Sequence, residues 1–286
     1  MNRRQFTNGL LLATATQPLR AQSLRGQANA APARVALLIG NAAYSDAPLR
    51  NPVNDVRELA GVLKPLGFVV TALEDQRLGE MREALRQFVL HTRAAEVRLV
   101  FFAGHGLQLR GRSYLLPVGA RINNETDILE RTTDATELVE QLSAIENGAN
   151  LVIIDACRSH PLFKSGTRRM WAAKPGLSAL AAPNGTVVAF STRPGQVARD
   201  GGVADGNGST GTGTGNDGGG PMSVYTRHLT RSLREAPDLP VEALFKRVRA
   251  GVVAETNHQQ VPWESSDLNG ELCFRPDQKG QCKRMQ

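Results

Sequence analysis

The chain has 286 residues, of which 41% are hydrophobic, and this is enough for one substantial core within one or two domains. The formal net charge is +7, but the charges are scattered and aromatic residues make up only 5% of the chain, which argues against a nucleic-acid-binding surface. No run of 18 apolar residues occurs, so we expect no stable membrane insertion.

The N-terminus has the pattern of an export signal. The pair Arg3 and Arg4 precedes a short apolar stretch at residues 9–13, and the segment ends in Arg20 and Ala21, as a cleaved leader would. This pattern is typical of a twin-arginine leader and predicts a signal over residues 1–21 and a periplasmic or secreted protein. The alternative is a disordered basic N-terminus. Residues 22–33 are rich in Ala, Gln and Ser and are predicted to form a linker.

From residue 34 onwards, apolar runs alternate with stretches of helical periodicity. Such alternation predicts parallel crossover units, and therefore an α/β fold with a mostly parallel sheet. The predicted strands are residues 34–41, 67–70, 97–102, 150–154, 185–192 and 270–274, with a short hairpin segment at 111–118. The predicted helices are residues 55–66, 78–92, 134–145, 223–233 and 241–254, the third with a capping-box start at Asp134 and Glu137.

Two of the predicted strands end in residues that carry chemistry. The unbroken apolar run 151–154, typical of a strand buried on both faces, leads into Asp155 and then Cys157. The run 97–102 leads into a predicted Gly-His-Gly turn around His105. Sites in parallel sheets lie beyond the carboxyl ends of the strands, so two neighbouring strands would place His105 and Cys157 at one edge. A thiolate with an imidazole base is a common pair for nucleophilic catalysis.

The chain has three cysteines. Cys273 and Cys282 lie close together near the C-terminus and are able to pair, which would leave Cys157 free. An odd cysteine in an exported protein is a candidate reactive thiol. The alternative for Cys157 is a small buried hydrophobic residue, and its strand-end position and the presence of His105 argue against that interpretation.

These motifs, taken in order, resemble those of bacterial metacaspases and orthocaspases, which are caspase-like cysteine peptidases of clan CD. His105 precedes Cys157 by 52 residues, and the caspase signature Q-A-C-[RQG]-G has a histidine about 50 residues upstream. Here Asp155 replaces Gln, and Ser159 replaces the final Gly. The resemblance covers roughly residues 33–275 and rests on 37–41, 54–55, 104–106 with 114–117, and 155–158. It implies the caspase-hemoglobinase fold, a mostly parallel six-stranded sheet flanked by helices, over 34–275, with a basic tail at 276–286.

The resemblance also implies roles for five residues. The chain would be a cysteine endopeptidase that cleaves protein or peptide substrates after Arg or Lys with a His105–Cys157 dyad. Backbone N–H groups of Gly106 and Cys157 would stabilise the oxyanion. Asp55 and Asp155 match acids that bind the basic side chain of the substrate, and two carboxylates would prefer a guanidinium or an ammonium and reject aspartate. The simpler interpretations are N-cap chemistry for Asp55 and a turn cap for Asp155.

The chain departs from the family pattern at Ala103, where many relatives have Ser, and this removes a polar pocket contact. Relatives often need calcium, but no contiguous loop of oxygen ligands is present, so calcium stays open as a cofactor. Two other functions compete. A zinc site made of His105, Cys157 and His160 lacks a clear fourth ligand. An inactive caspase-like scaffold would bind protein partners without cleaving them.

Two stretches after Cys157 have unusual compositions. Residues 201–220 are half glycine, which predicts a mobile loop, and no Gly-Lys-Ser/Thr follows to make it a phosphate loop. Basic residues lie in a stretch with little hydrophobic periodicity, namely Lys164, Arg168, Arg169 and Lys174. A peptidase specific for basic residues would be able to cut itself there, and the alternative is a solvated basic loop.

Overall fold

The computed structural model describes residues 33–157, 173–175, 177, 180–193 and 222–284. Its main sheet has the strand order β2-β1-β3-β6-β8-β9. These strands are β1 (Arg34–Gly40), β2 (Val69–Glu74), β3 (Val97–Leu109), β6 (Ala149–Cys157), β8 (Thr186–Phe190) and β9 (Trp263–Ser266). Neighbours from β2 to β8 are parallel, and β9 runs antiparallel to β8. The mostly parallel six-stranded sheet predicted from the sequence is therefore confirmed.

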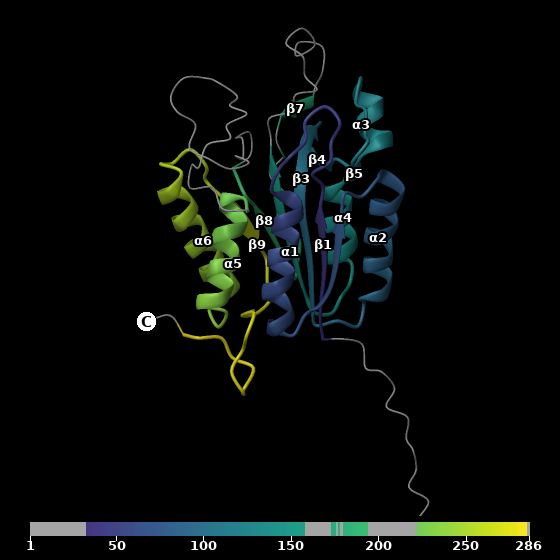
Figure 1. Cartoon of the computed structure of the whole chain (residues 1–286). Coiled ribbons are helices and arrows are strands. Elements are labelled where there is room, and N and C mark those ends of the chain that lie inside the picture. Colours follow the sequence, from purple (N-terminus) through teal and green to yellow (C-terminus); the bar gives the residue numbers. More distant parts are fainter. Residues whose placement is uncertain (1–32, 158–172, 176, 178–179, 194–221, 285–286) are drawn as a thin grey trace, which may run out of the picture. The chain divides into compact units, whose positions relative to one another are not determined.

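Helices cover both faces of this sheet (Figure 1). One face carries α1 (Pro52–Leu63), α5 (Val224–Glu235) and α6 (Val241–Glu255), and the other carries α2 (Leu78–His91) and α4 (Ala135–Ser143). Leu38 of β1 packs in the first core with Leu229 of α5, whereas Leu37 packs in the second core with Leu138 of α4. Successive strand residues point to opposite faces, so the apolar runs supply both cores. Shorter helices are η1 (Lys64–Leu66) and α3 (Glu125–Arg131).

β3 continues through the segment that the sequence predicts to be a turn. The Gly-His-Gly motif lies inside this strand. β3 pairs with β1 up to Ala103 and with β6 up to His105. From Gly106 onwards it pairs antiparallel with β4 (Arg112–Leu115), which lies within the predicted hairpin segment. The smaller strands β5 (Thr133–Asp134) and β7 (Ala173–Pro175) pair with β4 and β3 respectively. The predicted turn is wrong because a change of partner lets the backbone keep its hydrogen bonds without turning.

The C-terminal region differs from the prediction at one strand. The predicted strand 270–274 is wrong: the strand lies earlier, as β9, and Cys273 forms an isolated bridge with Pro240. Backbone hydrogen bonds to the α5–α6 connection hold this segment, from the Val241 N–H to the Leu272 carbonyl oxygen and from the Arg275 N–H to the Pro237 carbonyl oxygen. The Arg34 guanidinium also donates to the Cys273 carbonyl oxygen at 3.4 Å. Cys273 and Cys282 form a disulfide, which confirms the pairing that their spacing suggested.

Two helix starts differ in how well local signals predict them. α4 begins as predicted, because the Asp134 carboxylate accepts hydrogen bonds from the N–H groups of Thr136 and Glu137. The predicted start of α1 at Asp55 is wrong, since the helix begins at Pro52. Proline suits the first turn of a helix, where its missing N–H costs nothing. Asp55 therefore lies inside the first turn, and its side chain is available for a contact outside α1.

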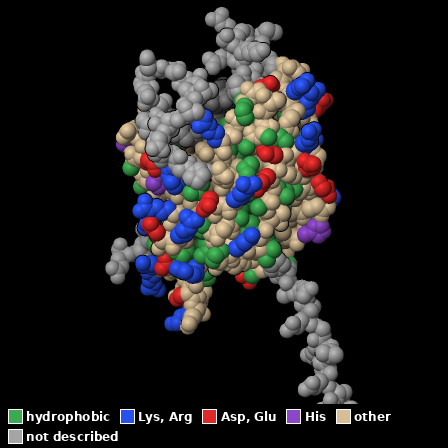
Figure 2. Space-filling model, in the orientation of Figure 1, with side chains coloured by type: hydrophobic (Ala, Val, Ile, Leu, Met, Phe, Trp, Pro, Cys, Tyr) green, Lys and Arg blue, Asp and Glu red, His purple; other side chains and the backbone are tan. Residues whose placement is uncertain are grey.

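Charges of both signs are interspersed on the face of the molecule shown in Figure 2. This distribution agrees with the scattered charges of the sequence, because no strip of basic side chains gathers on that face. None of the helices within the described ranges combines the length and the apolar character that a membrane span requires.

Candidate active site

His105 and Cys157 lie opposite each other at the carboxyl end of the parallel strands. β3 and β6 pair in continuous register up to His105 and Cys157, and Cys157 is the last residue of β6. Neighbouring strands lie about 4.8 Å apart, so the two backbones are direct neighbours. The prediction that these residues meet at one edge of the sheet is confirmed for their backbones.

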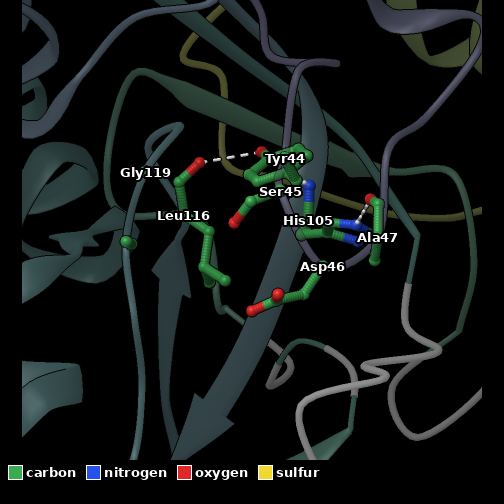
Figure 3. Close-up of a pocket in the computed structure, with 8 residues that line it drawn as sticks. Tyr44, Ser45, Asp46, Ala47, His105, Leu116 and Gly119 are labelled. Carbon is green, nitrogen blue, oxygen red and sulfur yellow. Dashed lines mark hydrogen bonds between the residues drawn. The ribbon is translucent and has the colours of Figure 1, made fainter.

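The His105 ring is buried and held by a backbone carbonyl. His105 is 4% exposed, and its Nε2 lies 2.8 Å from the Ala47 carbonyl oxygen (Figure 3). A carbonyl oxygen can only accept a hydrogen bond, so Nε2 carries the proton, and Nδ1 is the basic nitrogen of the neutral ring. The loop after β1 therefore selects one tautomer of this candidate base.

Tyr44, which the sequence analysis did not single out, supports His105 from a second side. Its hydroxyl accepts a hydrogen bond from the His105 backbone N–H at 3.1 Å and donates one to the Leu116 carbonyl oxygen at 2.9 Å. The rings of Tyr44 and His105 also pack together, with centroids 4.4 Å apart. Gly104 permits this approach, because a Cβ there would lie 2.6 Å from the Tyr44 hydroxyl oxygen. In the sequence Tyr44 is a single tyrosine in a loop, and nothing near it in the chain indicates a contact with His105.

The loop that carries Tyr44 and Ala47 is anchored by Asp75, just after β2. The Asp75 carboxylate accepts hydrogen bonds from the backbone N–H groups of Ala42 at 2.7 Å and Ala43 at 2.9 Å. Asp75 has a φ of 53°, in the left-handed region, which Asp tolerates better than most residues. A carboxylate outside the predicted site thus holds the loop that orients His105.

Asp55 and Asp155 converge on the first turn of α5. Both residues are buried, with exposed fractions of 1% and 6%. Ser223, the N-cap residue of α5, links them: its backbone N–H donates to Asp55 Oδ1 at 2.8 Å, and its hydroxyl donates to Asp155 Oδ2. The Thr226 hydroxyl donates to the same Asp155 oxygen at 3.1 Å. The structure thus brings together the two acids that were predicted to share a pocket.

The N-terminus of α5 compensates part of this concentrated negative charge. The first N–H groups of a helix have no partner within the helix, and the helix dipole adds partial positive charge at that end. In the β3–β6 register, the residue opposite Asp155 is Ala103, which has no hydroxyl group. The hydroxyl groups that donate to the Asp155 carboxylate come from Ser223 and Thr226 at the start of α5. Burial, and then the charge of Asp155, raise the pKa of Tyr225 well above its ordinary value, so Tyr225 stays neutral.

Gly40 allows α1 to deliver Asp55 to this place. A Cβ at Gly40 would lie 2.3 Å from the Pro52 carbonyl oxygen and 2.8 Å from Val56 Cγ2. Pro52 and Val56 flank Asp55 on the first turns of α1. The missing side chain at the end of β1 therefore sets how closely α1, and with it Asp55, approaches the sheet.

Gly106, the predicted oxyanion donor, follows His105 directly and packs tightly against β6. A Cβ at Gly106 would lie 3.1 Å from the Ala156 Cβ and 2.9 Å from Leu177 Cδ2. The backbone at Gly106 therefore lies close to the residue that precedes Cys157, at the edge where His105 and Cys157 meet.

The alternative prediction is a zinc site made of His105, Cys157 and His160, and the structure does not describe all three of these residues. Within the described part of the chain, no group of three or more His, Cys, Asp or Glu side chains is placed to hold a metal ion. His160, the third ligand of the zinc alternative, lies outside that part.

Comparison with known proteins gives similarities in sequence and in fold. The sequence profile of the caspase domain family matches residues 33–273. The Homo sapiens mucosa-associated lymphoid tissue lymphoma translocation protein 1 is 35% identical over 126 residues, and its Mus musculus homologue is 34% identical. Each match covers 44% of this chain but only 15% of the relative. The crystal structure of caspase-1 from Spodoptera frugiperda has a TM-score of 0.58 at 19% identity, over 93% of this chain and 99% of that one.

Proposed function

Because the chain belongs to the caspase domain family, we propose that it is a cysteine endopeptidase in which Cys157 and His105 form a catalytic dyad. Family membership supports cysteine peptidase activity. The observation that carries the dyad is the register of His105 opposite Cys157, with the ring held by Ala47. His105 accepts the thiol proton, the thiolate attacks the carbonyl carbon, and His105 returns the proton to the leaving amine.

Backbone N–H groups of Gly106 and Cys157 are the proposed donors to the oxyanion of the tetrahedral intermediate. The close packing of Gly106 against Ala156 supports this pairing, because it brings the two chain segments together at the sheet edge. Loss of a donor of this kind typically lowers the rate by about 10²–10³.

Asp55 and Asp155 support cleavage after Arg or Lys. Asp155 lies two residues before Cys157 in β6, and Asp55 reaches the same place from α1. Two buried carboxylates are costly unless positive partners compensate them. The N-terminus of α5 offers partial positive charge, and a guanidinium or an ammonium of a protein or peptide substrate would supply a full one.

The test uses matched peptides that differ only in the residue before the scissile bond, Arg, Lys or Asp, with and without added calcium. Cys157→Ala should abolish hydrolysis, and His105→Ala should lower it by several orders of magnitude. Asp55→Asn and Asp155→Asn should each weaken cleavage after Arg by about 2–5 kcal/mol, or roughly 30- to 5,000-fold. The control is Asp127→Asn, at a buried acid in the first turn of α3, which should leave the Arg-to-Asp preference unchanged.

Three outcomes separate the parts of this proposal. Hydrolysis by the Cys157→Ala protein would contradict the dyad, and faster cleavage after Asp than after Arg would contradict the acidic pocket. Alkylation of Cys157 by iodoacetamide, measured in the wild type and in the Asp55→Asn and Asp155→Asn proteins, distinguishes lost substrate binding from a lost nucleophile. The inactive scaffold is tested with a Cys-reactive peptide that has Arg at its reactive end, because an enzyme should be labelled at Cys157 and a scaffold should not.

We also propose that the enzyme cuts its own chain after basic residues that follow Cys157. Lys164, Arg168 and Arg169 lie outside the described residues, and Lys174 lies in β7, which pairs with β3. The support is the sequence together with the proposed specificity. On a denaturing gel, wild-type protein should be cut while the Cys157→Ala protein stays intact, and an active wild type that remains a single chain would contradict the proposal.

Export to the periplasm or beyond is likewise a proposal, and it rests on the N-terminal sequence. The twin-arginine signal at 1–21 lies outside the described residues, as do residues 22–32 of the linker. The disulfide between Cys273 and Cys282 supports the proposal, because structural disulfides persist mainly in oxidising compartments.

A further inference from the structure

A small pocket lies beside His105, on the side away from β6. Its lining includes Tyr44, Ser45, Asp46 and Ala47 of the loop after β1, together with His105 and Leu116. Figure 3 shows the side chains of Ser45 and Asp46 extending toward Leu116, while the Ala47 carbonyl holds the His105 ring on the other side. The mechanism proposed above uses this loop to hold His105, through the Ala47 carbonyl oxygen and the Tyr44 hydroxyl, and gives the pocket itself no role.

The chemistry of the proposed reaction determines which part of a substrate reaches this pocket. The sulfur of Cys157 forms a bond to the carbonyl carbon, the C–N bond breaks, and His105 gives its proton to the departing nitrogen. The leaving amine therefore lies on the His105 side of the scissile bond. In the sheet, β3 lies between β6 and β1. A substrate chain that continues from this amine away from Cys157 would therefore pass the loop after β1.

We infer that the pocket receives the side chain of the residue that follows the scissile bond and favours a basic residue over an acidic one. This inference rests on the proposed peptidase function. Asp46 supplies the charge: it is exposed, and it takes part in no ion pair within the described ranges. Among the other lining residues, Ala47 and Ala120 carry only a methyl group and Gly119 has no side chain, so no bulky group at these positions blocks the approach of a long flexible side chain to Asp46.

The test is a competition among peptides with Arg before the scissile bond and Lys, Ala or Glu after it. For the wild-type full-length chain we expect kcat/KM to be higher for Lys than for Glu by about three- to tenfold at low ionic strength, because Asp46 would attract the Lys and repel the Glu, each by the modest energy of an exposed charge pair. High salt should narrow this ratio, because it screens exposed charges. Asp46→Asn should reduce the ratio to within about twofold, and Asp46→Lys should invert it.

A matched control is Asp267→Asn, at an exposed acid that contacts the first residue of β8, at the opposite end of the sheet. It should leave the Lys-to-Glu ratio as in the wild type. Equal ratios in the wild-type and Asp46→Asn proteins would overturn the pocket assignment while leaving the dyad intact. Absence of cleavage for every peptide would instead overturn the proposed peptidase function, and this inference with it.

Discussion

Ser223→Ala measures how strongly the buried acids are tied to the first turn of α5. The Ser223 hydroxyl donates to Asp155 and at the same time accepts a hydrogen bond from the Thr226 N–H at 3.1 Å. The contact with Asp55 comes from the backbone N–H of residue 223, so it survives the substitution. The variant therefore removes the cap of α5 and one of the hydroxyl donors to Asp155, and leaves the other acid in place.

The expected magnitude follows from these two contacts. Loss of an N-cap hydroxyl costs about 1 kcal/mol, within a range of about 0.5–2 kcal/mol. A hydrogen bond to a charged group contributes about 1.5–3 kcal/mol, and Asp155, at 6% exposed, has little access to water as a replacement. Thr226 keeps its own bond to this carboxylate and limits the loss. We therefore expect Ser223→Ala to lower the free energy of unfolding by about 2–4 kcal/mol.

The assay is urea unfolding, with midpoint and slope measured for each variant. Asn124→Ala is the matched control, because Asn124 caps α3 by accepting from the Asp127 N–H, away from the acids; it should cost about 1 kcal/mol. Ser223→Thr keeps a hydroxyl and should recover most of the stability. If Ser223→Ala costs no more than Asn124→Ala, the contact with Asp155 contributes nothing and the reasoning is refuted.

Gly40→Ala would place a Cβ 2.3 Å from a backbone oxygen at the start of α1, and we expect it to cost about 1–3 kcal/mol in the same assay. The control is Gly61→Ala, inside α1, where no atom lies within 4 Å of the added Cβ; it should raise the free energy of unfolding by about 0.5–1 kcal/mol. If both variants lower the free energy of unfolding, the contact at Gly40 is not the cause. Replacing Arg3 and Arg4 with Lys should retain the protein in the cytoplasm on cell fractionation, and unchanged recovery from the periplasm would rule out a twin-arginine signal.

Local sequence determined the order of the longer helices and of the parallel strands, and it identified the chemically important residues that follow two of those strands' apolar runs. The apolar run 151–154 of β6 is unbroken, and the run 97–102 of β3 is interrupted only by Arg98, so both predict buried parallel strands without any knowledge of their neighbours. His105 and Cys157 follow from those runs, because each lies three residues after the end of the apolar stretch of its strand. The disulfide was equally local, since Cys273 and Cys282 are only nine residues apart.

Tertiary structure alone decided what these residues contact. Tyr44 lies 61 residues from His105, and Ser223 lies 168 residues from Asp55 and 68 from Asp155. No local pattern specifies which helix turn meets which strand end, because that depends on how β1, β3, α1 and α5 pack around a common core. The same holds for the Gly-His-Gly motif, which looks like a turn by itself and remains a strand because β6 and β4 take up its backbone hydrogen bonds in succession.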